Sequence, residues 1–162
     1  MDILIIIAGG TLDKVHDTIT EGLVFSKTGQ SQVGKILEQG RTYHPKTTVI
    51  MQKDSLDMND SDRVKILHAV KNAKQTRIVI THGTGTMELT AKYLAGKTND
   101  KTVVLTGAMR PNSLGKSDAG FNLGGAIIAA QTLGAGVFAV MNGRVIESNN
   151  LHKDTQLGRF DL

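Results

Sequence analysis

The sequence predicts an α/β fold, a doubly wound, mostly parallel sheet with helices on both faces and a C-terminal β-hairpin. Two observations predict this class. Short runs rich in β-branched residues alternate with segments of helical length, which is typical of strand–helix–strand units with parallel strands. The runs are nearly continuous in apolar residues, as expected of strands buried on both faces. A chain of 162 residues is long enough for one domain and short for two, so residues 1–162 are expected to form a single domain.

The elements follow in order along the chain. Strands are expected at residues 3–7, 48–51, 78–81, 103–106 and 137–141. Helices are expected at residues 31–39, 61–74, 86–94 and 121–133.

Local signals support individual elements. Val64, Leu67 and Val70 recur at three-residue spacing in the second helix, and Asn59, Asp60 or Ser61 is available as its N-cap. The dipeptide Asn142-Gly143 lies between the last strand run and Val145-Ile146, which is typical of a hairpin turn.

Composition excludes several classes of function. The chain has no cysteine, which removes disulfides, thiolate metal sites and a cysteine nucleophile. Its five histidines show no metal-ligand spacing, so no metal is expected. The 19 Lys and Arg are scattered among 15 Asp and Glu without a basic run, which argues against a nucleic-acid partner. No apolar run approaches a membrane span, and the start lacks a basic leader region, so a cytoplasmic location is expected.

The loops that follow the strands pair glycine with hydroxyl side chains. They are residues 8–11 (AGGT), 54–60 (DSLDMND), 81–86 (THGTGT) and 106–111 (TGAMRP). In parallel sheets the ligand crevice lies beyond the carboxyl ends of the strands. Glycine lets backbone N–H groups approach a ligand, and a hydroxyl can bind or attack it. Each loop alone also fits a tight turn with a cap residue, and the spacings of nucleotide-binding loops are absent.

Five ordered blocks resemble the bacterial-type L-asparaginase family, over nearly the whole chain and corresponding to that family's N-terminal domain. The blocks are residues 7–12 (IAGGTL), 55–60 (SLDMND), 80–88 (ITHGTGTME), 104–111 (VLTGAMRP) and 117–123 (SDAGFNL). The resemblance implies an amidohydrolase that converts a side-chain carboxamide to a carboxylate and ammonia through a threonine nucleophile. It implies no metal or organic cofactor, a small amide or amino acid as substrate, and a homo-oligomer, either dimer or tetramer.

The resemblance also implies roles for individual residues. Thr11 corresponds to the nucleophile, and Thr84 to a second essential threonine that works with a lysine, which Lys153 resembles. Ser55 would bind the substrate's α-carboxylate. The other substrate-binding positions lie on the glycine-rich turns and at the amide end of the pocket: Gly10, Gly83, Gly85 and Ala108. A threonine hydroxyl needs such a neighbour to draw off its proton, and backbone N–H groups of Thr11 and Thr84 would hold the oxyanion.

The sequence departs from the family in three places. Gly85 stands where the family has an aspartate that holds the α-ammonium group, and Leu56 stands where it has a glutamine. The chain also ends near the point where the family's smaller C-terminal domain would begin. Both substitutions remove polar contacts to the same head group, which favours a ligand without a free ammonium group or a degenerate pocket, unless Asp57 or Asp118 supplies a carboxylate there.

Alternatives remain open at this stage. The chain is either an amidohydrolase, acting on L-asparagine or a related amide, or a non-catalytic domain that binds an amino acid or a dicarboxylate. Thr11 and Thr84 also fit turn hydroxyls, and Lys153 a solvated charge. A triad of His82 with Ser55 is conceivable, although a structural histidine under the loop is the favoured interpretation.

Overall fold

The computed structural model describes residues 2–161 and contains a six-stranded central sheet in the order β4-β1-β5-β6-β7-β8. The first five of these strands run parallel, and β8 pairs antiparallel with β7. The central strands are β1 (Ile3–Gly9), β4 (Lys46–Lys53), β5 (Arg77–Thr81), β6 (Thr102–Thr106), β7 (Gly136–Met141) and β8 (Arg144–Glu147). The predicted fold class, including the hairpin at Asn142-Gly143, is therefore confirmed.

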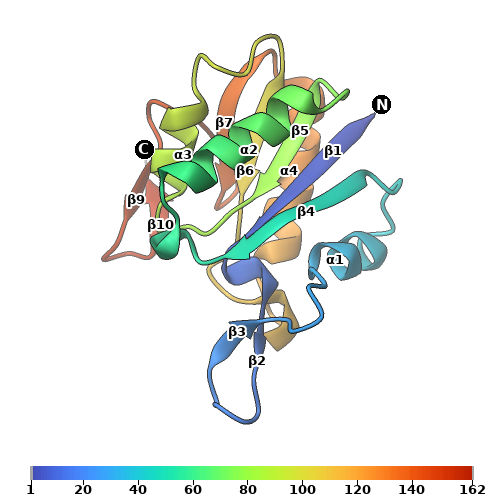
Figure 1. Ribbon diagram of the computed structural model, residues 1–162, viewed down its shortest axis with the longest axis vertical. Coiled ribbons are helices and arrows are strands. Elements are labelled where there is room, and N and C mark those ends of the chain that lie inside the picture. Colours follow the sequence, from blue (N-terminus) through green and yellow to red (C-terminus); the bar gives the residue numbers. More distant parts are fainter. Residues whose placement is uncertain (1, 162) are drawn as a thin grey trace.

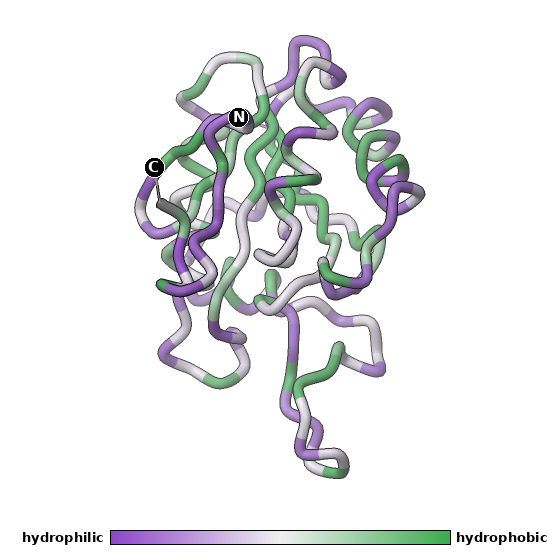
Figure 2. Tube along the Cα trace, turned by 90° about the vertical axis from the view of Figure 1, so that its left-hand side faces the viewer, coloured by the Kyte–Doolittle hydropathy of each residue, from purple (hydrophilic) through white to green (hydrophobic). Residues whose placement is uncertain are grey.

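Four helices cover the two faces of the sheet (Figure 1). They are α1 (Val33–Gln39), α2 (Asp60–Asn72), α3 (Met87–Leu94) and α4 (Ala119–Thr132). Apolar residues of α2 and α3 pack with one face of the strands, and those of α1 and α4 pack with the other. Figure 2 shows the resulting concentration of hydrophobic residues along the central strands. Asn59 is the residue that caps α2, in a capping box with Asp62.

Two small hairpins were not predicted from the sequence. One pairs β2 (Lys14–His16) with β3 (Leu23–Phe25) and projects from the body of the molecule (Figure 1). The other pairs β9 (His152–Asp154) with β10 (Arg159–Asp161). Each of these strands has only three residues. Strands this short carry too few residues for a periodic pattern to be recognised.

Element boundaries differ from the predictions by a few residues. The strand expected at residues 48–51 is the longer β4, and its residues are partly exposed because β4 forms one edge of the sheet. The expectation that every strand is buried on both faces is therefore wrong for β4. In contrast, β6 is buried along its whole length.

The strand order determines where a ligand would bind. From β1 the chain crosses to β4 on one side, and it returns after α2 to β5 on the other side of β1. The order reverses between β1 and β5, and ligands of doubly wound folds bind at the carboxyl ends of the strands beside such a reversal.

Among the described residues, none of the helices is long and apolar enough to cross a membrane.

Candidate active site

The loops after β1, β4 and β5 meet at this reversal, at Gly10, Ser55 and Gly83. A Cβ atom built on Gly10 would lie 2.4 Å from the Gly83 nitrogen, and one built on Gly83 would lie 2.5 Å from Ser55 Oγ. No side chain fits in either gap, so the three backbones touch. The loops that carry Thr11, Ser55 and Thr84 are therefore packed against one another.

Thr11 is the first residue of a short 3₁₀ turn, Thr11–Asp13, that follows Gly10. The turn is anchored by Asp13, whose fully buried carboxylate accepts hydrogen bonds from Ser31 Oγ at 2.6 Å and from the Gln32 backbone N–H at 2.8 Å. Burial raises the pKa of Asp13, with these hydrogen bonds acting in the opposite direction. The Thr11 turn is thus tied to the start of α1.

A second link joins the Thr11 loop to the Ser55 loop. Lys14 forms an ion pair with Asp54, and this hydrogen bond lowers the pKa of the Asp54 carboxyl. Asp54 also accepts a hydrogen bond from the Leu56 backbone N–H at 3.1 Å, so it caps the 3₁₀ turn Ser55–Asp57. The pair therefore holds two of the loops in a fixed relation.

Lys153 lies beside Thr84. Its Nζ atom donates a hydrogen bond of 2.8 Å to Thr84 Oγ1, although 69 positions separate the residues in the chain. The β9–β10 hairpin brings the lysine there, because Phe160, which is opposite Lys153 in the ladder, is buried in the core. The Phe160 backbone N–H also donates to Asn142 Oδ1 at 3.0 Å, which fastens the hairpin to the β7–β8 turn.

Ser55 is buried and its hydroxyl is engaged. Its Oγ accepts a hydrogen bond from the Thr86 backbone N–H at 3.2 Å, and its carbonyl oxygen accepts one from Thr86 Oγ1 at 2.7 Å. The side chain thus lies between Gly83 and the start of α3, and its hydroxyl keeps one lone pair and its proton for a further hydrogen bond.

The loop after β6 completes the site. A Cβ atom built on Gly107 would lie 2.4 Å from the His82 carbonyl oxygen, so this loop touches the one that carries Thr84. Ala108 is fully buried. Asn122 of α4 donates to the Gly107 carbonyl oxygen at 3.0 Å and accepts from the Asn142 N–H at 3.2 Å. Asn122 therefore connects the Ala108 loop with the turn on which the Lys153 hairpin rests.

Neither carboxylate considered as a replacement at Gly85 lies against that glycine. Asp118 accepts hydrogen bonds from the backbone N–H groups of Met109 and Arg110 and from Asn122. The atoms nearest to a Cβ on Gly85 belong to Leu56 and Ser55, not to Asp57.

His82 is a structural residue beneath the loop. The side chain is fully buried, with Nδ1 at 2.7 Å from the Gly83 carbonyl oxygen and Nε2 at 2.9 Å from Thr90 Oγ1. A carbonyl oxygen only accepts, so Nδ1 carries the proton and Nε2 accepts from the threonine hydroxyl. Both ring nitrogens are occupied away from Ser55, which argues against a triad with that serine.

Acidification is expected to destabilise the fold through His82. Burial lowers the pKa of His82 to about 4 from an ordinary value of 6.5. Between these values the unfolded chain binds a proton that the folded chain does not, so the free energy of unfolding falls as the pH falls. At about 1.4 kcal/mol per pH unit, this window accounts for up to about 3 kcal/mol.

Urea unfolding at a series of pH values measures this effect, with His82→Gln as the matched variant that does not titrate. The raised pKa of Asp13 acts in the opposite direction over part of the same range, and it is present in both proteins. If buried His82 is neutral, the free energy of unfolding falls more steeply with decreasing pH in the wild type than in the variant. Equal slopes would show that His82 is not held neutral.

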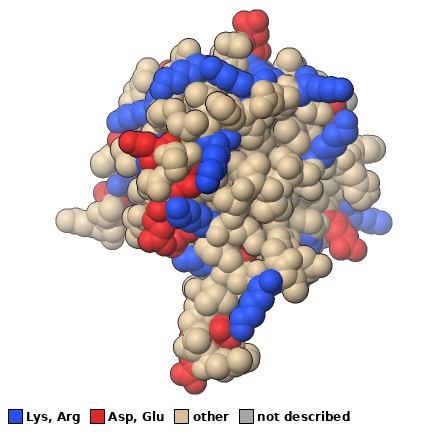
Figure 3. Space-filling view, viewed as in Figure 1, with Lys and Arg blue, Asp and Glu red and all other residues tan. Residues whose placement is uncertain are grey.

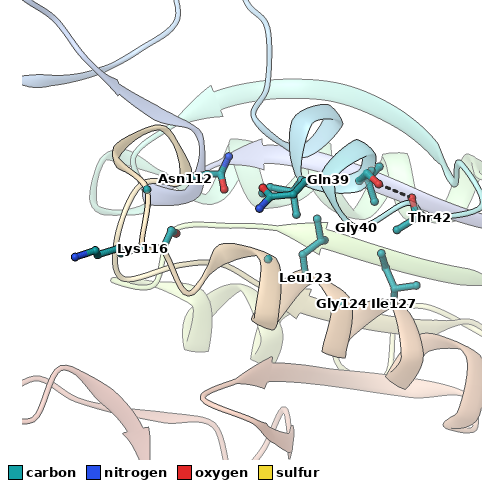
Figure 4. Close-up of a pocket in the computed structure, with 13 residues that line it drawn as sticks. Gln39, Gly40, Thr42, Asn112, Lys116, Leu123, Gly124 and Ile127 are labelled. Atoms are coloured by element: carbon teal, nitrogen blue, oxygen red, sulfur yellow. Dashed lines mark hydrogen bonds between the residues drawn. The ribbon is translucent and has the colours of Figure 1, made fainter.

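The chain also has a cavity of about 600 Å³ between α1, α4 and the loop before α4 (Figure 4). Leu123 and Ile127 line it from α4, Gln39 and Gly40 from the end of α1, and Lys116 extends away from it. The cavity is lined by none of the site residues described above.

On the face seen in Figure 3, acidic side chains lie among the basic ones.

The supporting residues of the site were not identified from the sequence. Asp13, Lys14, Asp54 and Asn122 each hold a loop or a turn in place. Asn122 had a detectable signal, since it is the one amide in the apolar first half of its helix. The Lys14–Asp54 pair joins positions 40 residues apart and left no local pattern.

The fold and the site together define a doubly wound α/β protein with clustered hydroxyl groups and a lysine at the strand-order reversal. The family model for the N-terminal region of asparaginases matches residues 2–159, and the chain belongs to this family. L-asparaginase 2 of Escherichia coli K12 is 32% identical over 160 residues, which cover 94% of this chain and 46% of that protein.

Two further relatives extend the comparison. A component of the glutamyl-tRNA(Gln) amidotransferase of Pyrococcus horikoshii is 30% identical over 98% of this chain and 38% of that protein. The structure of the thermostable L-asparaginase from Thermococcus kodakarensis superposes with a TM-score of 0.84 at 26% identity, covering 99% of this chain and 51% of that one. The chain therefore spans about half the length, or less, of the curated relatives it matches.

Proposed function

We propose that this chain is an amidohydrolase that cleaves a side-chain carboxamide to a carboxylate and ammonia, with Thr11 as nucleophile. The observation that carries the proposal is the hydrogen bond of Lys153 to Thr84 within a loop packed directly against the Thr11 turn. Membership of the asparaginase family supports amide chemistry. The relatives include both an asparaginase and an amidotransferase component, so the substrate depends on the residues of this site.

The reaction requires one nucleophile, one proton path and one oxyanion site. The Thr11 hydroxyl oxygen attacks the amide carbon, the C–N bond breaks, and an ester on Thr11 remains until water hydrolyses it. The proton lost by Thr11 must reach the leaving nitrogen. Thr84 accepts a hydrogen bond from Lys153, so its own hydroxyl proton points away from the lysine. We assign Thr84 to relay the proton: its oxygen accepts the proton from Thr11 as its own proton passes to the leaving nitrogen.

Two more groups act on the substrate. Backbone N–H groups of Thr11 and Thr84 follow Gly10 and Gly83, and we assign them to the oxyanion. The Ser55 hydroxyl, next to Gly83, is assigned to the substrate carboxylate, and the Ala108 carbonyl oxygen to the amide NH₂ group. Self-association into a dimer or tetramer and a cytoplasmic location stay predictions.

Replacement of Lys153 by methionine is expected to lower kcat by about 10²–10⁴-fold, the range typical of lost general acid–base assistance. The methionine stem fills similar space and removes the donor to Thr84. Lys153→Arg keeps the positive charge and a donor, so it shows how much of the effect comes from these two properties rather than from the shape of the lysine. Ammonia release measures kcat for the three proteins, and a methionine variant within threefold of the wild type would remove Lys153 from the mechanism.

Ammonia release from L-asparagine, L-glutamine, D-asparagine and succinamate, a deaminated amide, tests the proposed function. Turnover of any of these by pure wild-type protein supports it. The competing function is a non-catalytic domain that binds an amino acid or dicarboxylate. Calorimetric binding of aspartate or succinate by folded protein that releases no ammonia from the panel would favour that domain instead.

A further inference from the structure

Leu56 and Gly85, the two residue positions that depart from the family pattern, are in contact. A Cβ atom built on Gly85 would lie 2.8 Å from Leu56 Cδ2, 3.1 Å from Leu56 Cγ and 3.2 Å from Ser55 Oγ. The Leu56 side chain therefore occupies the space in which a side chain at position 85 would begin. The leucine is 74% exposed, so its apolar surface is open to a ligand.

The position of this pair in the site gives it a role. Leu56 follows Ser55 directly, and Gly85 follows Thr84 directly. Ser55 offers a hydroxyl and Lys153, at 2.8 Å from Thr84 Oγ1, offers a positive charge. A ligand that reaches Thr84 thus meets an apolar leucine surface beside groups that favour a carboxylate.

An ammonium group on the ligand would be placed badly here. It would give up part of its hydration against Leu56 and would lie near the Lys153 ammonium group that binds the adjacent Thr84, and like charges at short range repel each other. A methylene group at the same position of the ligand would instead contact the leucine and bury apolar area.

We propose that the substrate class is the monoamide of a dicarboxylic acid without an α-amino group, selected by Leu56 packed over Gly85. This inference rests on the proposed function. It treats Leu56 as a specificity-determining residue whose effect depends on the absence of a side chain at position 85. It also predicts that the two positions are coupled, because a side chain at position 85 would begin 2.8 Å from Leu56 Cδ2 and the leucine would have to turn aside.

The first test compares kcat/KM for succinamate and L-asparagine, which differ only in the ammonium group. Succinamate is expected to be favoured by at least about tenfold, the smaller end of what one pocket contact discriminates. Equal or better turnover of L-asparagine would overturn the inference and leave the proposed function standing.

Binding of the products gives a readout that needs no turnover. Calorimetry is expected to give succinate a Kd at least about tenfold lower than that of L-aspartate. Absence of ammonia release would remove the proposed function, whereas tighter binding of L-aspartate than of succinate would remove the inference alone.

Paired variants test the coupling. Gly85→Asp, Leu56→Gln and the double variant are compared with the wild type in the ratio of kcat/KM for the two amides. The double variant is expected to move this ratio toward L-asparagine by more than the product of the two single changes, because each residue blocks or frees the other. Leu89→Gln, at an exposed leucine of α3, is the control and should leave the ratio unchanged. If the change in this ratio for the double variant equals the product of the changes for the two single variants, the two positions are not coupled.

Discussion

Replacement of Thr11 by alanine is expected to lower the rate of amide hydrolysis at least about 10³-fold, because no other group of the site forms the ester intermediate. Removal of a nucleophile leaves only the assistance from oxyanion donors and substrate binding. The fold should persist, since Asp13, rather than Thr11, ties this turn to α1 through Ser31 and Gln32. Ammonia release at saturating substrate measures the rate of hydrolysis, and circular dichroism on the same samples shows whether the fold persists.

Thr11→Ser is the matched variant, because serine keeps the hydroxyl and loses only a methyl group. It should retain a rate within about tenfold of the wild type, as expected when the attacking oxygen is preserved. An alanine variant with more than a tenth of the wild-type rate would rule out Thr11 as the nucleophile.

Replacement of Gly10 by alanine is expected to lower the free energy of unfolding by at least about 3 kcal/mol. Gly10 has φ 89° and ψ 177°, a region that is essentially restricted to glycine. The new Cβ would also lie 2.4 Å from the Gly83 nitrogen and 2.6 Å from the His82 carbonyl carbon, which are both backbone atoms. Strain and collision therefore add, and the Thr11 and Thr84 loops must separate.

Substitutions at two other glycines distinguish backbone strain from collision of the new Cβ atom. Gly29 has φ 71° with nothing within 4 Å of a built Cβ, so Gly29→Ala should show strain alone, about 1–2 kcal/mol. Gly34, inside α1, has open space and ordinary φ, so alanine there should stabilise by about 0.5–1 kcal/mol. Urea unfolding gives all three values, and a Gly10 variant no less stable than the Gly29 variant would contradict the close contact of the loops.

The central sheet was predictable because each buried strand contains an almost unbroken run of apolar residues. The run at residues 103–106, for example, lies within a strand whose five residues are all buried. The β9–β10 hairpin was not predictable, since His152–Asp154 is polar and three residues long. Its position depends on Phe160, which is buried through contacts far along the chain.

The candidate site was predictable only in part. Glycine paired with hydroxyl after consecutive strands indicated Thr11, Ser55 and Thr84, and parallel strands bring such loops to one edge. The resemblance to asparaginases indicated Lys153. The contact of Leu56 with Gly85 was hidden, because the sequence shows two separate departures, 29 positions apart, and only the packing of the loops shows that one fills the space of the other.

The chain spans about half the length of the curated relatives it matches. The loops after β1, β4, β5 and β6 and the Lys153 hairpin all belong to it. Every group to which we assign a chemical role therefore lies within residues 2–161.

An ester on Thr11 is the intermediate that distinguishes nucleophilic attack by this residue from any other route. Protein mixed with succinamate, quenched in acid during turnover and digested, is examined by mass spectrometry for a succinyl group. The account predicts that the added mass is found on the peptide with Thr11 and is absent in the Thr11→Ala variant. Acylation of Thr84 instead, or ammonia release with no acylated peptide under conditions that preserve esters, would contradict it.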